Sequence, residues 1–183
     1  MHSHVCIEDI FSKFYTGNKP LLSTVSIHSE AVAGLALQIA DVKNLDLDRD
    51  FVREAALLHD IGVVRCDAPG IHCHGSLPYI CHGVEGRKML DGLGLERHAL
   101  VCERHTGSGL TVDDIIRQKL PLPARDMCPQ TLEEKIICYA DKFFSKSGNL
   151  TEKKSLQKVI SQMEKFGPDS LNRFMALHEI FAS

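Results

Sequence analysis

Ala55-Ala56-Leu57-Leu58-His59-Asp60-Ile61-Gly62 is an apolar helical run that leads directly into a histidine and a carboxylate. A charged carboxylate at the end of a buried helix is costly unless a cation or several hydrogen-bond donors compensate it. Histidine and aspartate are both common metal ligands. The stretch therefore predicts a buried metal-binding pair, and Gly62 is expected to end the helix.

Apolar residues recur at helical spacing on the N-terminal side of this stretch as well. Asp50 is the expected N-cap of a helix over residues 51–60. A longer helix is expected over residues 21–42, where one stripe has steps of four, three and four. The members of that stripe are His28, Val32, Leu35 and Ile39. The pattern thus predicts that His28 faces the core.

A second core-facing carboxylate is predicted further along the chain. Thr131-Leu132-Glu133-Glu134 has the form of a capping box, which opens a helix. The inner stripe of that helix consists of Ile137, Ala140, Asp141 and Phe144. Asp141 would therefore lie in the core, and a cation shared with the other buried ligands would offset the cost of that burial.

The remaining pattern is helical throughout. Further helices are expected over residues 5–15, 82–90, 96–105, 152–165 and 169–181, and a short one after Thr111. Residues 63–81 and the segment around Pro121 and Pro129 are too interrupted for a long element. No β-alternating segment of any length occurs. The predicted fold class is all-α, a compact bundle of about seven to nine helices.

Composition narrows the classes of function. With 44% hydrophobic and 25% charged residues and a formal charge of −3, the chain is an ordinary globular protein without the basic excess of nucleic-acid binders. No run of about 18 apolar residues and no leader-like N-terminus occur, which indicates a cytoplasmic protein that does not enter a membrane. The seven cysteines are widely spaced and odd in number, so reduced thiols are expected.

Six candidate metal ligands emerge from these elements. Two histidines and two aspartates among them suit one divalent metal that keeps open coordination positions for water or substrate. Two more histidines near helix ends bring the total to six ligands, which is too many for one catalytic metal but fits two. The six are His28, His59, Asp60, His82, His105 and Asp141. A dinuclear site needs a carboxylate whose two oxygens reach both metals, and Asp60, central in the order, is the expected bridge.

The order His28, His59-Asp60-Ile61-Gly62, His82, His105 and Ala140-Asp141 resembles the HD-domain metallophosphohydrolase superfamily. The resemblance covers roughly residues 26–145 and is closest to the dinuclear branch, which includes hydrolases that cleave diadenosine tetraphosphate symmetrically. It implies that the six residues above hold two divalent metal ions, either iron, manganese or zinc, with magnesium as a further alternative. The length of the chain predicts a single domain over residues 1–183; with the resemblance it is expected to be HD-type, with its core at about 21–146 and a helical tail over 151–183.

A dinuclear site of this kind implies hydrolysis at phosphorus. Two metals about 3.5–4 Å apart lower the pKa of a bridging water, which then attacks in line. The phosphoryl oxygens need further cations, and the catalytic candidates are Arg104 and Lys142, which adjoin His105 and Asp141 in sequence. Weaker candidates for substrate binding, including two histidines that could protonate a leaving alkoxide, are Arg65, His72, His74, Arg87 and Lys146.

The expected function is a phosphohydrolase acting on a small phosphorylated metabolite, a nucleotide or dinucleotide, with neither a nucleic-acid duplex nor a membrane as partner. Two alternatives stay open: a di-iron oxygenase of the same superfamily, and a non-catalytic nucleotide-binding regulatory module. A homo-oligomer is also left open. A structural zinc site built from Cys66, Cys73, Cys81, His72 and His74 is a weaker interpretation, because the paired Cys-x-x-Cys spacing is missing.

Overall fold

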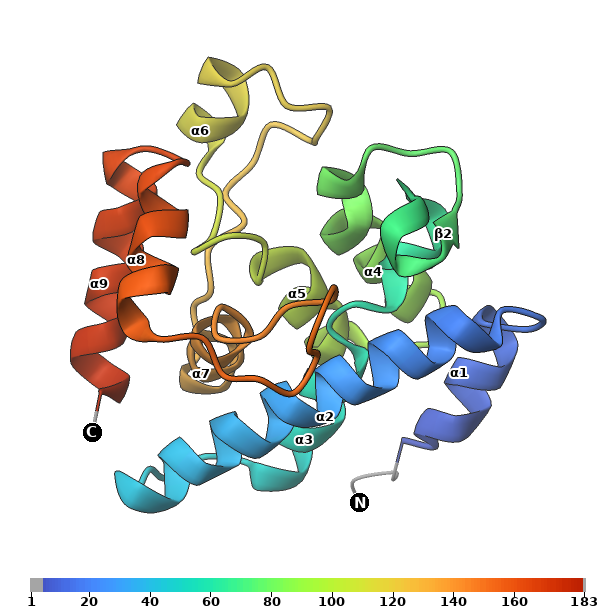
Figure 1. Ribbon diagram of the computed structural model, residues 1–183, viewed down its shortest axis with the longest axis horizontal. Coiled ribbons are helices and arrows are strands. Elements are labelled where there is room, and N and C mark those ends of the chain that lie inside the picture. Colours follow the sequence, from blue (N-terminus) through green and yellow to red (C-terminus); the bar gives the residue numbers. More distant parts are fainter. Residues whose placement is uncertain (1–4, 183) are drawn as a thin grey trace.

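The computed structural model describes residues 5–182, which form nine α-helices and one minimal β-hairpin (Figure 1). The α-helices are α1 (Ile7–Phe14), α2 (Lys19–Val42), α3 (Arg49–Leu58), α4 (His82–Asp91), α5 (Glu96–Arg104), α6 (Val112–Arg117), α7 (Leu132–Asp141), α8 (Leu156–Glu164) and α9 (Pro168–Phe181). The all-α prediction is confirmed.

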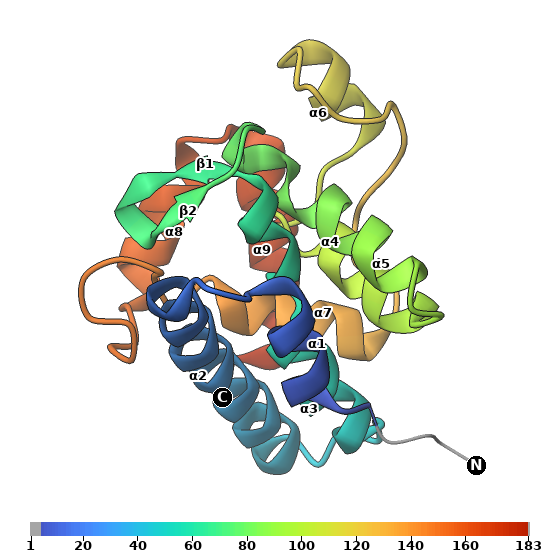
Figure 2. The same cartoon turned by 90° about the vertical axis from the view of Figure 1, so that its right-hand side faces the viewer.

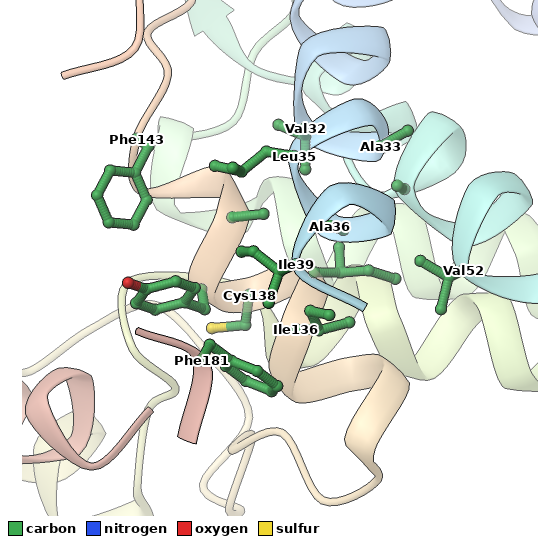
Figure 3. Packing of buried hydrophobic residues seen from close by; sticks show 14 of the residues in the cluster. Val32, Ala33, Leu35, Ala36, Ile39, Val52, Ile136, Cys138, Phe143 and Phe181 are labelled. Atoms are coloured by element: carbon green, nitrogen blue, oxygen red, sulfur yellow. The ribbon is translucent and has the colours of Figure 1, made fainter. Parts of the chain in front are cut away.

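The long helix α2 crosses the lower part of the molecule and contributes six buried residues to the main core (Figure 1). Its stripe of His28, Val32, Leu35 and Ile39 is buried, as the spacing predicted. By length and composition α2 could span a membrane, but here its apolar stripe packs against α3, α7 and α9. Figure 3 shows Leu35 and Ile39 of α2 beside Cys138 of α7 and Phe181 of α9.

Helix α7 runs between α2 and the two C-terminal helices. Tyr139 stacks on Phe174 of α9 with ring centroids 5.6 Å apart, and Phe174 and Phe181 are almost fully buried. Burying an aromatic or aliphatic side chain of this size contributes about 1.5–3 kcal/mol. The C-terminal tail is therefore an integral part of the core rather than an appendage.

The helix starts require two corrections. Asp48, not Asp50, is the N-cap of α3, and its carboxylate accepts a hydrogen bond from the Phe51 N–H at 3.0 Å. At α7 the Thr131 hydroxyl accepts from the Glu134 N–H, as predicted. The Glu134 carboxylate, however, accepts from the Gln130 N–H, one residue earlier than a capping box requires. At α7 the Arg104 guanidinium also donates to both Glu134 oxygens, so a tertiary partner shares the side chain that the capping box would use.

The interrupted segment after Asp60 folds into short elements. These are three 3-10 helices and two antiparallel strands: η1 (Ile61–Arg65), β1 (Asp67–Ala68), η2 (Pro69–Ile71), β2 (Cys73–His74) and η3 (Tyr79–Cys81). Figure 2 shows this hairpin beside the N-terminal end of α2, where the side-chain amide of the N-cap Asn18 donates to the His72 carbonyl at 2.8 Å. All seven cysteines are free, and among the described residues no metal-binding cluster includes a cysteine.

Gly62 has a different role from the one predicted. It does not adopt the left-handed conformation of a helix-ending glycine; it lies in η1 against the start of α4. A Cβ atom at this position would collide with the His82 carbonyl oxygen and the Gly86 backbone nitrogen. Gly62 therefore permits the backbones of η1 and α4 to approach closely.

Candidate metal centre

The structure brings all six predicted ligands together, although they come from five different elements. Each lies near a helix end or in the long core helix: His28 in α2, His59 and Asp60 after α3, His82 at the start of α4, His105 after α5 and Asp141 at the end of α7. All six are buried. Helix ends converge here, so their side chains can meet without breaking helical hydrogen bonds.

Four residues form the first half of the cluster. The Oδ2 atom of Asp60 lies 3.0 Å from His59 Nε2 and 3.4 Å from His28 Nε2. The Oδ1 atom of Asp141 lies 3.0 Å from His28 Nε2 and 3.5 Å from His59 Nε2. These four ligand atoms all lie within 4.8 Å of one another, which is close enough for all of them to bind one ion.

The second half uses the other oxygen of the same aspartate. Asp60 Oδ1 lies 3.6 Å from His82 Nε2 and 3.4 Å from His105 Nε2, and the two histidine nitrogens are 3.0 Å apart. The two carboxylate oxygens of Asp60 therefore each face one group of ligands. This is the geometry of a bridging carboxylate, and the groups could hold metal ions.

Backbone carbonyls fix the orientation of three of the rings. The Nδ1 atoms of His59, His82 and His105 lie 2.6 to 2.7 Å from the carbonyl oxygen of the residue three positions earlier. Because a carbonyl can only accept, each Nδ1 carries a proton and each Nε2 is left to face the cluster. Such outer contacts hold metal-binding histidines in the correct tautomer.

The charges of the two aspartates persist despite burial. Burial raises the pKa of Asp60, but His59 and Lys146 outweigh it and hold that pKa well below its usual value. Burial likewise raises the pKa of Asp141, and Lys142 and Lys146 reverse the effect. Both side chains are therefore carboxylates at neutral pH, as metal binding requires.

The histidines divide into two kinds. Burial and the neighbouring His105 lower the pKa of His82 to about 3, and burial lowers the pKa of His105 as well. His59 behaves differently: burial lowers its pKa, but Asp60 and Asp141 outweigh this and raise it to about 9. Two rings are thus neutral and ready to bind a cation, while the third carries a proton.

The donor set fits a divalent cation. His59 Nε2 and both carboxylate oxygens of Asp60 are buried without a well-aligned hydrogen-bond partner among the described residues. Buried polar atoms are usually satisfied, so such a group needs an explanation. Four imidazoles and two carboxylates are the ligand types that zinc, iron and manganese share. Lys146 Nζ lies 2.7 Å from Asp60 Oδ2, but a bound cation would give all three atoms a common partner.

Metal binding is expected to release a proton from His59, because its Nε2 must be free to bind the ion. With a pKa of about 9, the ring is protonated at neutral pH, so the affinity should fall on acidification. We expect about a tenfold loss per pH unit between pH 8 and pH 6. Competition between the protein and a chromophoric chelator for Co²⁺ measures this slope, and an affinity independent of pH over that range would contradict it.

Two of the predicted cations reach the cluster. Lys146 Nζ lies 2.7 Å from Asp60 Oδ2. Lys142 Nζ lies 2.6 Å from Asp141 Oδ2 and donates to the His105 carbonyl at 3.1 Å. Both lysines also line the cavity described below. Lys146, predicted as a weaker candidate than Arg104, therefore has the more direct position.

The other predicted cations and histidines lie elsewhere. The Arg104 guanidinium donates to both carboxylate oxygens of Glu134 at 2.9 and 3.0 Å, which joins α5 to α7. Arg87 pairs with the buried Glu103 and with Asp91. The remaining three are exposed around the β-hairpin: Arg65, His72 and His74. The structure does not bring these five residues into the metal cluster.

A cavity of about 470 Å³ opens over the cluster. Its floor includes His82, His105 and Asp141, and Tyr79 stacks on His82 at its edge with ring centroids 4.7 Å apart. The far wall comes from the tail: Gln162, Met163, Phe166, Ser170 and Arg173. The sequence analysis assigned no site residue to the tail, and Met163, which also belongs to the main core, shows that one side chain here serves both the core and the cavity.

Comparison with known proteins identifies relatives of this chain. Residues 25–145 match the HD domain family. An uncharacterized protein of Methanocaldococcus jannaschii is 40% identical over 138 residues, which cover 75% of this chain and 71% of that protein. No solved structure gave a significant match.

Two further relatives are longer proteins. Each is named tRNA (cytidine(56)-2'-O)-methyltransferase: the one from Picrophilus torridus is 33% identical over 157 residues, and the one from Thermoplasma volcanium is 32% identical over 158. The matches cover 85% of this chain but 41% of each methyltransferase. The chain therefore spans less than half the length of these two relatives.

Proposed function

The chain belongs to the HD domain family, and from that membership we propose that it is a metal-dependent phosphohydrolase. Its substrate would be a small phosphorylated metabolite, a nucleotide or dinucleotide. One observation carries the proposal: each oxygen of Asp60 faces its own group of metal ligands, and members of both groups, His82, His105 and Asp141, line a cavity together with Lys142 and Lys146. A phosphate placed there would meet both halves of the site.

The chain's own residues would prepare the site in three ways. Divalent metal ions, when bound, supply a hydroxide nucleophile at neutral pH and positive charge for the phosphoryl oxygens. Asp60 would hold both halves of the site at a fixed separation, and the histidines would keep their Nε2 atoms aimed inward through their Nδ1 contacts. The ammonium groups of Lys142 and Lys146 would offset the negative charge that the phosphoryl group gains in the transition state.

The size of the cavity favours a small molecule over a nucleic-acid duplex. All six ligands are buried, and the cavity of about 470 Å³ is in the range of small-ligand pockets. A duplex could not bring a backbone phosphate to the floor of such a cavity without large rearrangement. We therefore propose a free phosphorylated metabolite as the partner of this site.

The relatives named as tRNA methyltransferases do not change this proposal. Alignments that cover 85% of the chain include most of the span between His28 and Asp141. We infer that this chain corresponds to a metal-binding part of those longer proteins. Methyl transfer is not proposed for it, since a cluster of histidines and aspartates is a site for metal ions.

A panel of phosphoesters tests the proposed activity. Protein loaded with Mn²⁺, Fe²⁺, Zn²⁺ or Mg²⁺ should release phosphate or a nucleotide from at least one class of substrate. Lys146→Ala should lower kcat/KM by about 10²-fold, because a positioned charge next to the reacting phosphoryl group is lost. Bound metal should be retained in this variant, as measured by elemental analysis.

Lys158→Ala is the matched control, because Lys158 is an exposed lysine of α8 that does not line the cavity. Its kcat/KM should equal that of the wild type. Absence of hydrolysis over the whole panel with metal bound would overturn the proposal. Substrate-dependent oxygen uptake by the iron form without phosphate release would instead establish the oxygenase alternative.

A further inference from the structure

The C-terminal helix pair presents a second face to the cavity. Met163, Phe166, Ser170 and Arg173 follow one another at steps of three, four and three, across the Gly167–Pro168 junction between α8 and α9. All four line the cavity. They also lie beyond residues 25–145, the part of the chain that matches the HD domain family. This wall of the site is therefore supplied by the chain's own C-terminal segment.

The wall is held in place from both sides. Met163 itself belongs to the main core, together with Val159, Phe174, Leu177 and Phe181 on the inner side of the tail. On the cavity side the Ser108 hydroxyl donates to the Ser170 carbonyl at 2.7 Å. Arg173 donates to Asp114 Oδ2 at 2.6 Å and to the Gly109 carbonyl at 3.1 Å. These contacts tie the tail to the loop that follows the ligand His105, so its position relative to the metal centre is fixed.

Phe166 is the exception in this well-packed wall. It lies in the turn between α8 and α9 and is 57% exposed, although the tail's other phenylalanines, Phe174 and Phe181, are almost fully buried. The residues across the cavity are also largely apolar: Tyr79, Ile80, Leu110 and Leu120. An exposed aromatic ring in the lining of a cavity offers a flat apolar surface against which a ligand can pack.

The lining of the cavity is chemically mixed. Lys142 and Lys146 lie against the metal ligands, where a phosphate would bind. Beside the apolar residues, the lining also contains the charged Lys154, Asp114 and Arg173 and two amide side chains, Gln118 and Gln162, of which Gln162 accepts from Lys154 Nζ at 3.3 Å. Amides can both donate and accept hydrogen bonds, so they suit the polar edges of a flat ring. A sugar phosphate without an aromatic ring would leave these apolar and amide side chains unmatched.

We propose that Phe166 determines the specificity of this site by packing against a flat aromatic group, such as a nucleobase, of the phosphoester. The inference rests on the proposed phosphohydrolase function only for the placement of the phosphate. Base–aromatic stacking contributes enough binding energy to change the affinity several-fold to more than a hundredfold. The C-terminal tail would thus determine the substrate specificity, while the elements of residues 25–145 carry the metal ligands.

The test compares Phe166→Ala with the metal-loaded wild-type protein. Selectivity, measured as kcat/KM for adenosine, guanosine, cytidine and uridine monophosphates relative to glycerol 2-phosphate, should fall roughly tenfold in the variant. The loss should appear in KM rather than in kcat. The Kd for the preferred nucleoside monophosphate, measured calorimetrically, should rise by the same factor. Phe166→Tyr, which keeps the ring, should restore both values.

Ile180→Ala is the matched control, because Ile180 is also an exposed apolar residue of the tail, in α9, but does not line the cavity. Its selectivity and Kd should be unchanged. Unaltered selectivity and Kd in Phe166→Ala would overturn the inference, and phosphate release from glycerol 2-phosphate in that case would leave the phosphohydrolase proposal standing. Conversely, Phe166-dependent binding of a nucleotide without any hydrolysis would support the inference while the proposed function fails.

Discussion

Asp60→Asn is expected to remove the metal centre while leaving the fold intact. The wild-type protein should contain about two equivalents of divalent metal, and the variant well below one. The reason is geometric: each Asp60 oxygen faces one group of ligands, and an amide replaces one oxygen with an NH₂ group that cannot bind a cation. Elemental analysis of protein purified without chelator measures the change directly.

Hydrolytic activity should fall together with the metal content in this variant. Loss of a single positioned electrostatic group typically lowers the rate about 10²–10³-fold, and loss of the bridging ligand should lower the rate by a larger factor. Asp67→Asn, at an exposed position of β1, is the matched control and should keep both metal and activity. A folded Asp60→Asn protein with undiminished metal content would refute the bridging role.

Gly62→Ala is expected to lower the free energy of unfolding more than any other substitution considered above. The added Cβ would meet the His82 carbonyl oxygen and the Gly86 backbone nitrogen, neither of which can move as a flexible side chain would. Over-packing in a core typically costs about 1–3 kcal/mol, and a collision with backbone atoms on two sides should exceed this range. The free energy of unfolding, measured by urea denaturation of the metal-free protein, gives the result.

Gly34→Ala provides the matched control for this substitution. Gly34 lies in α2, is exposed, and a Cβ there would meet nothing within 4 Å. Because alanine favours helix more than glycine, this variant should be more stable by about 0.5–1 kcal/mol. Equal effects of the two substitutions would mean that η1 and α4 are not held by the close approach at Gly62. The same approach joins Asp60 to His82, so Gly62→Ala should also weaken metal binding.

The sequence predicted much of the ligand set because each ligand carries a local signature. His28 lies on an apolar stripe of helical period, and Asp141 interrupts another. Both are costly to bury alone, and this cost is a property of the residue and its immediate neighbours. The structure indeed buries both, 3.0 Å apart, from elements more than 100 positions apart in the chain.

The assignment of cations could not be made in the same way. Arg104 and Lys142 each adjoin a ligand in sequence, but successive helical residues point in directions about 100° apart. Lys142 turns toward the cluster, whereas Arg104 turns to Glu134 on α7. Lys146, which follows the end of α7, reaches Asp60 itself. Such choices depend on which helix packs alongside, and a local pattern does not contain that information.

The tail illustrates the same division between local and long-range information. Its two helices were predictable from their period, and so was the all-α class. Whether those helices cover the core, form a wall of the cavity or pair with a second subunit was not, because each outcome uses the same amphipathic pattern. Periodicity, capping and the cost of burying charge act over a few residues, so the sequence by itself determined the helices and the metal-binding residue types. Asp60 was the expected bridge from its place in the chain, but the direction in which each of its oxygens points arises only when distant helices dock. The same holds for the close approach at Gly62 and the cavity wall around Phe166, which the tertiary structure alone decided.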